Sequence, residues 1–283
     1  MMQINHFSLN CGGRLVDLST PALMGILNIT PDSFYEGSRF QALESVLAQV
    51  GKFLSAGATF IDIGGHSTRP GAEAVSETEE TARVLPIIQG ILKAFPQALI
   101  SIDTFRASVA KASIEAGAVM VNDISGGNLD AKMFETVAAL QVPYVLMHSR
   151  GTPQTMQSLN QYDDLILDVL AEIQQKVYQL RQLGLHDIVV DLGFGFAKNI
   201  DQNYQLLSRL RDFEILNCPM LVGVSRKSMI WKFLAQSPQE ALNGSTVLNT
   251  FALLNGANIL RVHDVKEAME TLKLVEKLKE SSL

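Results

Sequence analysis

Eight short apolar runs recur along the 283-residue chain, and each ends in Gly, Asn, Asp, His or Ser. Within a run the apolar residues are largely continuous, which is the pattern of strands buried on both faces of a parallel sheet. The sequence therefore predicts eight strands, at residues 22–28, 59–65, 99–103, 119–123, 143–148, 188–193, 220–225 and 259–264.

Segments with helical periodicity lie between these runs. Ser76, followed three residues later by Glu79, predicts a helix start with a capping box. Gly117 and Gly184 predict helix ends, because glycine commonly follows the last helical residue. The predicted helices are 42–56, 76–95, 106–116, 165–183, 242–254 and 265–278.

Strands that alternate with helices predict a parallel sheet, and eight such units in a chain of this length predict a closed (β/α)8 TIM barrel. Residues 3–20 precede the first strand. Their alternation around Cys11-Gly12-Gly13-Arg14 predicts a short N-terminal β-hairpin that plugs the bottom of the barrel. We find no linker-like segment, and we expect residues 1–283 to form a single domain.

The composition narrows the class of protein. Hydrophobic residues make up 47% of the chain, and the formal net charge of −6 argues against a general binder of nucleic acid or membrane surfaces. The first residues do not resemble a signal peptide, and no uncharged apolar run is long enough to span a membrane. Two cysteines, Cys11 and Cys218, provide no disulfide framework. We expect a cytoplasmic protein.

The predicted strands end in polar residues, at the face where TIM barrels place their chemistry. A single Asp at such a position is more often the cap of a helix than a catalyst. A ring of acids, amides and bases on one face is different, because burying it would be costly without a polar ligand. These residues are Asn28, Asp62, His66, Asp103, Asn122, Asp123, Met147-His148, Asp191, Ser225 to Ser228, Arg261 and His263.

One group of these residues suits a flat heterocycle. Asp103, Asn122, Asp191 and Lys227 together offer the donors and acceptors that a ring system rich in N–H and C=O groups would need.

A second group suits a phosphate-bearing leaving group. Arg69, Arg261 and His263 are cationic or can become so, and arginine binds phosphate oxygens in a bidentate manner. Asn28 offers an oxygen beside them, which suits Mg²⁺ held mainly by substrate phosphates. The turn at Ser225 to Ser228 is expected to open a helix, whose N-terminus attracts anions.

A metal held by His66, His148 and His263 is an alternative, since these residues fall on the second, fifth and eighth strands. No helix carries an HExxH pattern, and this alternative is the weaker one.

Several stretches together resemble the dihydropteroate synthase family, in the family's order from residue 24 to 264. MGILNITPDSF (24–34) and DIGGHSTRPGA (62–72) are the most specific. The others are SIDT (101–104), VNDISG (121–126), LMH followed by RGTP (146–153), DLGFGFAK (191–198), GVSRKS (223–228) and RVHD (261–264).

The resemblance implies that a dihydropterin bearing a hydroxymethyl diphosphate loses diphosphate and is captured by the amine of p-aminobenzoate. It assigns the pterin to Asp103, Asn122, Met147, Asp191, Lys227 and Arg261, with Asp103, Asp191 and Lys227 as catalytic residues. It assigns the diphosphate to Asn28, Arg69, Arg261 and His263, with Mg²⁺ on Asn28. The site of p-aminobenzoate, the substrate that sulfonamides mimic in this family, would be lined by Thr68, Pro70 and Ser228.

The family also tends to form dimers through the last helices, which favours a homodimer. Leu248, Phe251, Leu253 and Leu254 are apolar positions there that could lie either in the core or at a dimer surface.

Some positions depart from the family pattern. His66 stands where Glu is common, Tyr35-Glu36-Gly37-Ser38 where Ser-Asp-Gly-Gly is common, and Leu192 where Pro is common. None of these is a residue assigned to a ligand. We expect the loops 28–38 and 66–74, rich in Gly, Pro and Ser, to be mobile and to order around the substrates.

Two rival functions remain. A pterin-binding methyltransferase acting on methyltetrahydrofolate and a corrinoid would share the acids and amides, but it would not need STRPGA, SRKS or the pair Arg261 and His263. A non-catalytic pterin-binding paralogue would not need Asn28, Thr68 and Lys227.

Overall fold

Eight parallel strands close into a barrel in this computed structural model. The structure describes residues 6–29, 39–66, 75–152 and 154–281, with only the backbone described at 39–42. The order around the barrel is β10-β3-β4-β5-β6-β7-β8-β9, and every neighbouring pair is parallel. The predicted TIM barrel is therefore confirmed, with strands β3 (Ala22–Asn28), β4 (Phe60–Gly64), β5 (Leu99–Asp103), β6 (Met120–Asp123), β7 (Tyr144–Met147), β8 (Ile188–Asp191), β9 (Met220–Val222) and β10 (Ile259–Val262).

Each observed strand lies inside a predicted run, and the differences fall mainly at the carboxyl ends. The run at 220–225 shows the largest difference, because β9 stops at Val222. The backbone then turns, and Arg226 adopts a left-handed conformation with φ of 54°. Residues beyond the end of β9 are no longer held in the sheet, so the chain can bend there. Residues 225–227 form the loop that leads into the next helix, which begins at Ser228.

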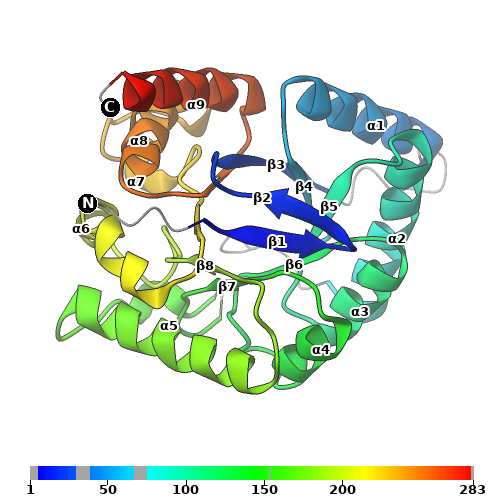
Figure 1. Cartoon of the computed structure of the whole chain (residues 1–283), viewed down its shortest axis with the longest axis horizontal. Coiled ribbons are helices and arrows are strands. Elements are labelled where there is room, and N and C mark those ends of the chain that lie inside the picture. Colours follow the sequence, from blue (N-terminus) through cyan, green and yellow to red (C-terminus); the bar gives the residue numbers. More distant parts are fainter. Residues whose placement is uncertain (1–5, 30–38, 67–74, 153, 282–283) are drawn as a thin grey trace.

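Helices cover the outside of the barrel (Figure 1). The Ser76 hydroxyl accepts a hydrogen bond from the backbone N–H of Glu79 at 3.2 Å, which is one half of the predicted capping box. The carboxylate of Glu79 pairs with Arg83 instead of completing the other half. The six predicted helices are α1 (Arg39–Ser55), α2 (Glu77–Ala94), α3 (Ala107–Glu115), α5 (Leu165–Gln182), α8 (Leu242–Leu254) and α9 (Val265–Glu280). Helices α4 (Met133–Leu140) and α6 (Ile200–Ser208) were not predicted from the sequence, nor were the 3₁₀ segments Met156–Ser158, Leu210–Leu216 and Pro238–Glu240. The helix expected after Ser225 is α7 (Ser228–Trp231).

The barrel interior is built in rings, because side chains two residues apart on a strand point to the same face. At least one apolar residue from every strand joins a single buried cluster at the amino-terminal end of the barrel. Residues of the opposite parity pack outward against the helices in a second cluster. The members of the inner ring are Met24, Phe60, Leu99, Met120, Val145, Val189, Leu221 and Ile259.

A hairpin closes the barrel beneath this ring, as the sequence predicts. Strands β1 (Ser8–Cys11) and β2 (Arg14–Asp17) pair antiparallel around Gly12-Gly13. Both glycines have positive φ, 62° and 88°, as the two-residue turn of a tight hairpin requires. Leu9, Cys11, Val16 and Leu18 belong to the same cluster as the inner ring, and Figure 1 shows the hairpin lying across the centre of the barrel.

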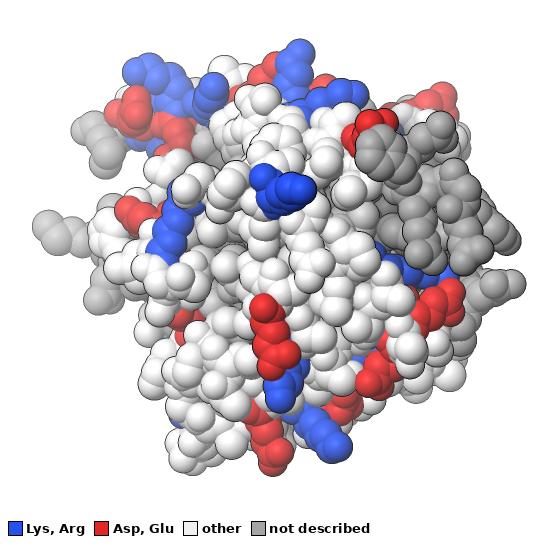
Figure 2. All heavy atoms as spheres, turned by 90° about the vertical axis from the view of Figure 1, so that its right-hand side faces the viewer, with Lys and Arg blue, Asp and Glu red and all other residues white. Residues whose placement is uncertain are grey.

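Charged side chains are dispersed on the face shown in Figure 2, where Lys and Arg alternate with Asp and Glu among uncharged residues. Among the described residues, this face shows no continuous basic surface. Within the described part of the chain, no helix combines the length and the apolar character that crossing a bilayer requires.

The hairpin offers a matched test of its role as a plug. Leu9 is 1% exposed, and Leu15 on the same hairpin is 73% exposed. We expect Leu9→Ala to lower the free energy of unfolding by about 2–5 kcal/mol, because it leaves a cavity against the inner ring. Leu15→Ala should change it by less than about 0.5 kcal/mol. Urea unfolding measures both, and equal effects would contradict the plug.

Candidate active site

A second ring of side chains lies two residues beyond the apolar ring, and it is largely polar. The parity of the strands that buries Phe60 and Leu221 also turns Asp62 and Gly223 into the barrel mouth. This ring consists of Ile26, Asp62, Ser101, Asn122, Met147, Asp191, Gly223 and Arg261. Two residues further on, Asn28, Gly64 and Asp103 end their strands, with Gly64 in register with both.

Arg261 holds two carboxylates together inside the mouth. Its Nε donates to Asp62 Oδ2 at 2.6 Å, and its Nη2 donates to Asp103 Oδ2 at 2.7 Å. The same oxygen of Asp62 accepts from Asn122 Nδ2 at 2.9 Å. Burial alone would lower the pKa of Arg261, but Asp62 and Asp103 outweigh it and the pKa is raised. The guanidinium therefore stays charged in a largely buried position.

Lys227 and Asp191 occupy the neighbouring part of the mouth. The ammonium of Lys227 donates to the carbonyl of Phe194 and stands 5.0 Å over the ring of Phe196. Gly223 lies beside it, and a Cβ built there would be in ordinary contact with Lys227 Nζ at 3.9 Å. Asp191 accepts from the backbone of Gly193 at 2.8 Å. Burial raises the pKa of Asp191, and the charge of Lys227 opposes that rise.

The acid and the base of this mouth have pKa values close to neutrality. Burial raises the pKa of Asp103 to about 7, against the lowering effect of Arg261 and with a further rise from Asp62. Burial also lowers the pKa of Lys227 to about 8, against the charge of Asp191. Such shifts are typical of functional sites, because each group can change its charge near pH 7.

Asn28 ends β3 at the rim, and it is exposed. A Cβ built on Gly64 would lie 3.6 Å from Asn28 Oδ1 and 3.7 Å from Asp103 Cβ, so the glycine leaves open the space between these side chains. One amide oxygen at an open rim fits Mg²⁺ that takes its other ligands from substrate phosphates and water. Among the described residues, no cluster of three His, Cys, Asp or Glu side chains forms a protein-only metal site.

His263 directly follows β10, and Ser228 begins the helix that follows β9. His263 Nδ1 is 3.2 Å from the hydroxyl of Ser225, which also accepts from the backbone of His263. Ser228 begins α7, and this helix has only four residues. Its N-terminus therefore adds less to anion binding than the sequence suggested. Arg226 turns away from the mouth to a two-bond pair with Asp264 at 2.8 and 2.9 Å.

Some predicted positions lie outside the described residues. These are Thr68, Arg69 and Pro70, together with Tyr35 and Glu36 and most of the two loops expected to be mobile.

The neighbouring His66 is described, and its buried Nδ1 has no hydrogen-bond partner among the described residues. Its ring packs edge-on against Phe105 at 5.3 Å between centroids. Burial lowers the pKa of His66, so the neutral ring is favoured near pH 7. Nearby, Glu80 and Arg106 form a buried ion pair.

A network that the sequence analysis missed lies behind the loop that follows β8. Lys198 Nζ is 2.9 Å from His148 Nδ1, and it also donates to the carbonyls of Gly193 and Phe196. His148 Nε2 is 3.1 Å from Glu172, which binds Arg150 as well. Both nitrogens of His148 are therefore engaged, which disfavours it as a metal ligand. The motif 191–198 contained Lys198, but only the fold brings helix α5 to it.

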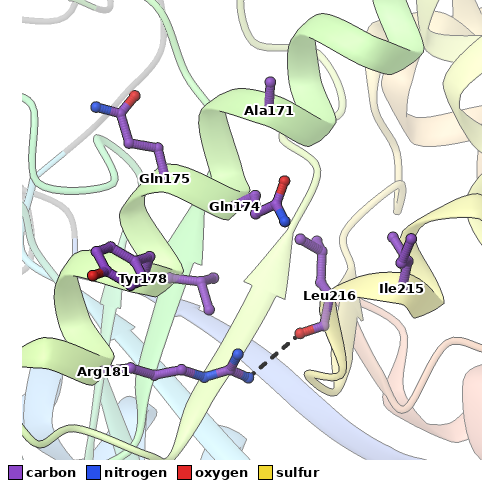
Figure 3. A pocket seen from close by; sticks show the side chains of 8 residues that line it. Ala171, Gln174, Gln175, Tyr178, Arg181, Ile215 and Leu216 are labelled. Atoms are coloured by element: carbon purple, nitrogen blue, oxygen red, sulfur yellow. Dashed lines mark hydrogen bonds between the residues drawn. The ribbon is translucent and has the colours of Figure 1, made fainter.

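A surface hollow lies elsewhere, between α5 and the 3₁₀ segment Leu210–Leu216 (Figure 3). Its charged side chain, Arg181, already donates to the carbonyls of Leu216 and Asn217 and to the sulfur of Cys218. This hollow contains none of the residues of the barrel mouth, and we assign no chemistry to it.

Comparison with known proteins agrees with this geometry. Residues 24–263 match the family model of pterin-binding enzymes. The chain is 42% identical to dihydropteroate synthase of Escherichia coli over 266 residues, which cover 93% of this chain and 94% of that protein.

Solved structures give the same result. The sulfonamide complex of Yersinia pestis dihydropteroate synthase superposes with a TM-score of 0.90 at 42% identity, covering 97% of this chain and all of that one. The Xanthomonas albilineans enzyme in complex with 7,8-dihydropteroate gives a TM-score of 0.84 at 33% identity, covering 96% and 99%. This chain, with its ring of acids, amides and bases inside a closed barrel, belongs to the dihydropteroate synthase family of pterin-binding enzymes.

Proposed function

We propose that the barrel mouth joins a dihydropterin diphosphate to p-aminobenzoate, giving 7,8-dihydropteroate and diphosphate. The observation that carries this proposal is the cluster of Arg261, Asp103, Asn122, Asp191 and Lys227 in the mouth of a barrel of this family. The cluster offers carboxylate, amide and ammonium groups at short range to a heterocycle that is rich in donors and acceptors.

The pterin lies among these groups in this proposal. Asp103 and Asp191 accept its N–H groups, Asn122 offers an amide, and Lys227 donates to a ring oxygen or nitrogen. Met147, which is in register with Asp191 across β7 and β8, packs against the ring. Arg261 borders both the pterin and the diphosphate.

The diphosphate lies at the rim, near Asn28 and His263, with Arg69 completing its cationic surroundings. Mg²⁺, held by Asn28 and the diphosphate, would stabilise the negative charge that builds up on the leaving group. Thr68, Pro70 and Ser228 line the site of p-aminobenzoate in this assignment.

The reaction is dissociative in our proposal. The bond between the methylene carbon and the diphosphate oxygen breaks first, and its electron pair leaves with the diphosphate. The electron-rich pterin spreads the positive charge, and the carboxylates of Asp103 and Asp191 stabilise it. The amine of p-aminobenzoate then attacks the methylene carbon and loses one proton.

An exposed apolar face supports a homodimer. Val247, Phe251 and Leu254 follow one another along α8 at helical spacing and are 57%, 39% and 42% exposed. Leu274 and Leu278 are exposed on α9, which packs beside α8. Leu253, by contrast, is buried in the core. Apolar side chains exposed along two neighbouring helices favour an interface.

The activity is tested by measuring diphosphate release from the dihydropterin diphosphate. We expect release to depend on p-aminobenzoate and on Mg²⁺, and to stop when EDTA is added. Binding of the pterin without any release would favour a non-catalytic paralogue. Methyl transfer from methyltetrahydrofolate to a corrinoid would favour the rival methyltransferase.

The pH profile tests the roles of Asp103 and Lys227. If the reaction needs ionised Asp103, kcat/KM rises as the pH increases through about 7, where this raised pKa lies. If it needs protonated Lys227, kcat/KM falls above about 8, where this lowered pKa lies. We therefore expect a narrow bell-shaped profile.

Asp103→Asn is the matched variant for the acidic side of this profile. It should lower kcat by about 10²- to 10³-fold, because a charge that stabilises the cation is lost. Pterin binding should persist, and the rise through pH 7 should disappear. Unchanged turnover in this variant would rule out the dissociative role of Asp103.

The dimer is tested by placing charges on the apolar face. We expect the parent protein to sediment as a dimer, and the double variant Phe251→Glu/Leu254→Glu to sediment as a monomer, since buried unpaired charges are costly at an interface. Leu167→Glu, on the exposed side of α5, is the matched control and should leave the dimer intact. A monomeric parent protein would refute the proposal.

A further inference from the structure

Asp62 is a fully buried carboxylate directly beneath the groups assigned to the pterin. It lies on β4 in register with Ile26 and Ser101, one ring deeper in the barrel than Asn28 and Asp103. Its exposure is 0%, whereas the side chains of its partner Arg261 and of Asp103 are 18% and 13% exposed. A ligand that enters through the mouth therefore meets Arg261 and Asp103 before it could reach Asp62.

The contacts of Asp62 fix the orientation of Asn122. An ionised carboxylate accepts hydrogen bonds and cannot donate them. The group of Asn122 that faces Asp62 Oδ2 at 2.9 Å must therefore be its NH₂. This leaves the amide oxygen and the second N–H of Asn122 for the ligand. Without Asp62 the amide could rotate by half a turn and exchange its donor for its acceptor.

The same carboxylate fixes the plane of Arg261. The guanidinium is a rigid planar fork, and its bonds to Asp62 through Nε and to Asp103 through Nη2 determine where the remaining N–H groups point. Asp62 and Asp103 both form ion pairs with the guanidinium of Arg261. If Asp62 were absent, Arg261 would have Asp103 as its remaining carboxylate partner, and the pterin would have to compete with a stronger ion pair for Asp103.

We propose that Asp62 is a positioning residue of the pterin subsite, which contacts no substrate and holds Asn122 and Arg261 in the orientation that binds the pterin. This inference rests on the proposed function, because it takes Asn122 and Arg261 as pterin ligands. In the sequence Asp62 is one polar strand end among several, and nothing in its position along the chain shows what it contacts.

The test measures binding directly, by titrating each variant with an oxidised pterin that lacks the diphosphate and cannot react. Asp62→Ala leaves the buried N–H groups of Asn122 and Arg261 without their acceptor, and we expect the Kd for this pterin to rise about 10- to 100-fold. In Asp62→Asn the amide oxygen can still accept from both Asn122 and Arg261, but the negative charge is lost. The Kd of this variant for the pterin should rise less. Ser113→Ala, at a fully buried position on α3 outside the barrel mouth, is the control and should bind like the parent protein.

A double-mutant cycle separates positioning from a general structural role. If Asp62 acts through Asn122, Asp62→Ala should weaken binding at least about fivefold less in an Asn122→Ala background than in the parent protein. If the double variant raises the Kd by the full product of the two single effects, the inference is overturned. It is also overturned if Asp62→Ala leaves the Kd unchanged. Thermal melting checks that each variant folds, and the cycle is repeated with Asp62→Asn if the alanine variant does not.

The two proposals fail in different ways. If the parent protein does not bind the pterin, the proposed function is wrong. If the parent protein binds and turns over, but Asp62 shows no coupling to Asn122, only the role of Asp62 is wrong.

Discussion

The alternation of side chains along each strand connects the bottom of this barrel to its mouth. The parity that places Met24, Phe60 and Ile259 on the hairpin also places Asp62 and Arg261 two residues higher in the interior. A shift of one residue in any strand would move its polar side chain to the helix layer and an outward-facing apolar side chain into the mouth. The packing of the hairpin and the geometry of the site therefore depend on the same register.

Burying charges in this mouth is possible because they are paired. An isolated guanidinium would be strongly disfavoured beside the apolar ring. Ion pairs with two carboxylates, which the closed barrel brings together, stabilise Arg261 there. The cost of burial remains visible in the pKa values, which move toward neutrality for Asp103 and Lys227. A site organised in this way can change its charge with small changes in its surroundings, including the arrival of a charged substrate.

The network around Lys198 supports the site from behind. Lys198 binds the carbonyls of Gly193 and Phe196, and the loop that these residues form supplies the carbonyl of Phe194 to Lys227. Burial lowers the pKa of Lys198 to about 7, and burial with the Lys198 charge lowers the pKa of His148 to about 4, so a neutral imidazole is favoured near pH 7. The loop after β8 is therefore tied to α5, and it holds Lys227 on a supported backbone.

The sequence by itself determined the fold and predicted which polar residues the strand ends bring to the barrel mouth. Strands buried on both faces are continuous apolar runs, and their polar ends are visible without a structure. The missed helices have local reasons. α4 has eight residues, too few for a clear period. α6 begins at Ile200 after the N-cap Asn199, whose capping box with Gln202 is visible in the sequence. Only the tertiary structure decided the partners. Arg261 and Asp62 are 199 residues apart, and their pairing depends on the closure of the barrel, which no local pattern encodes.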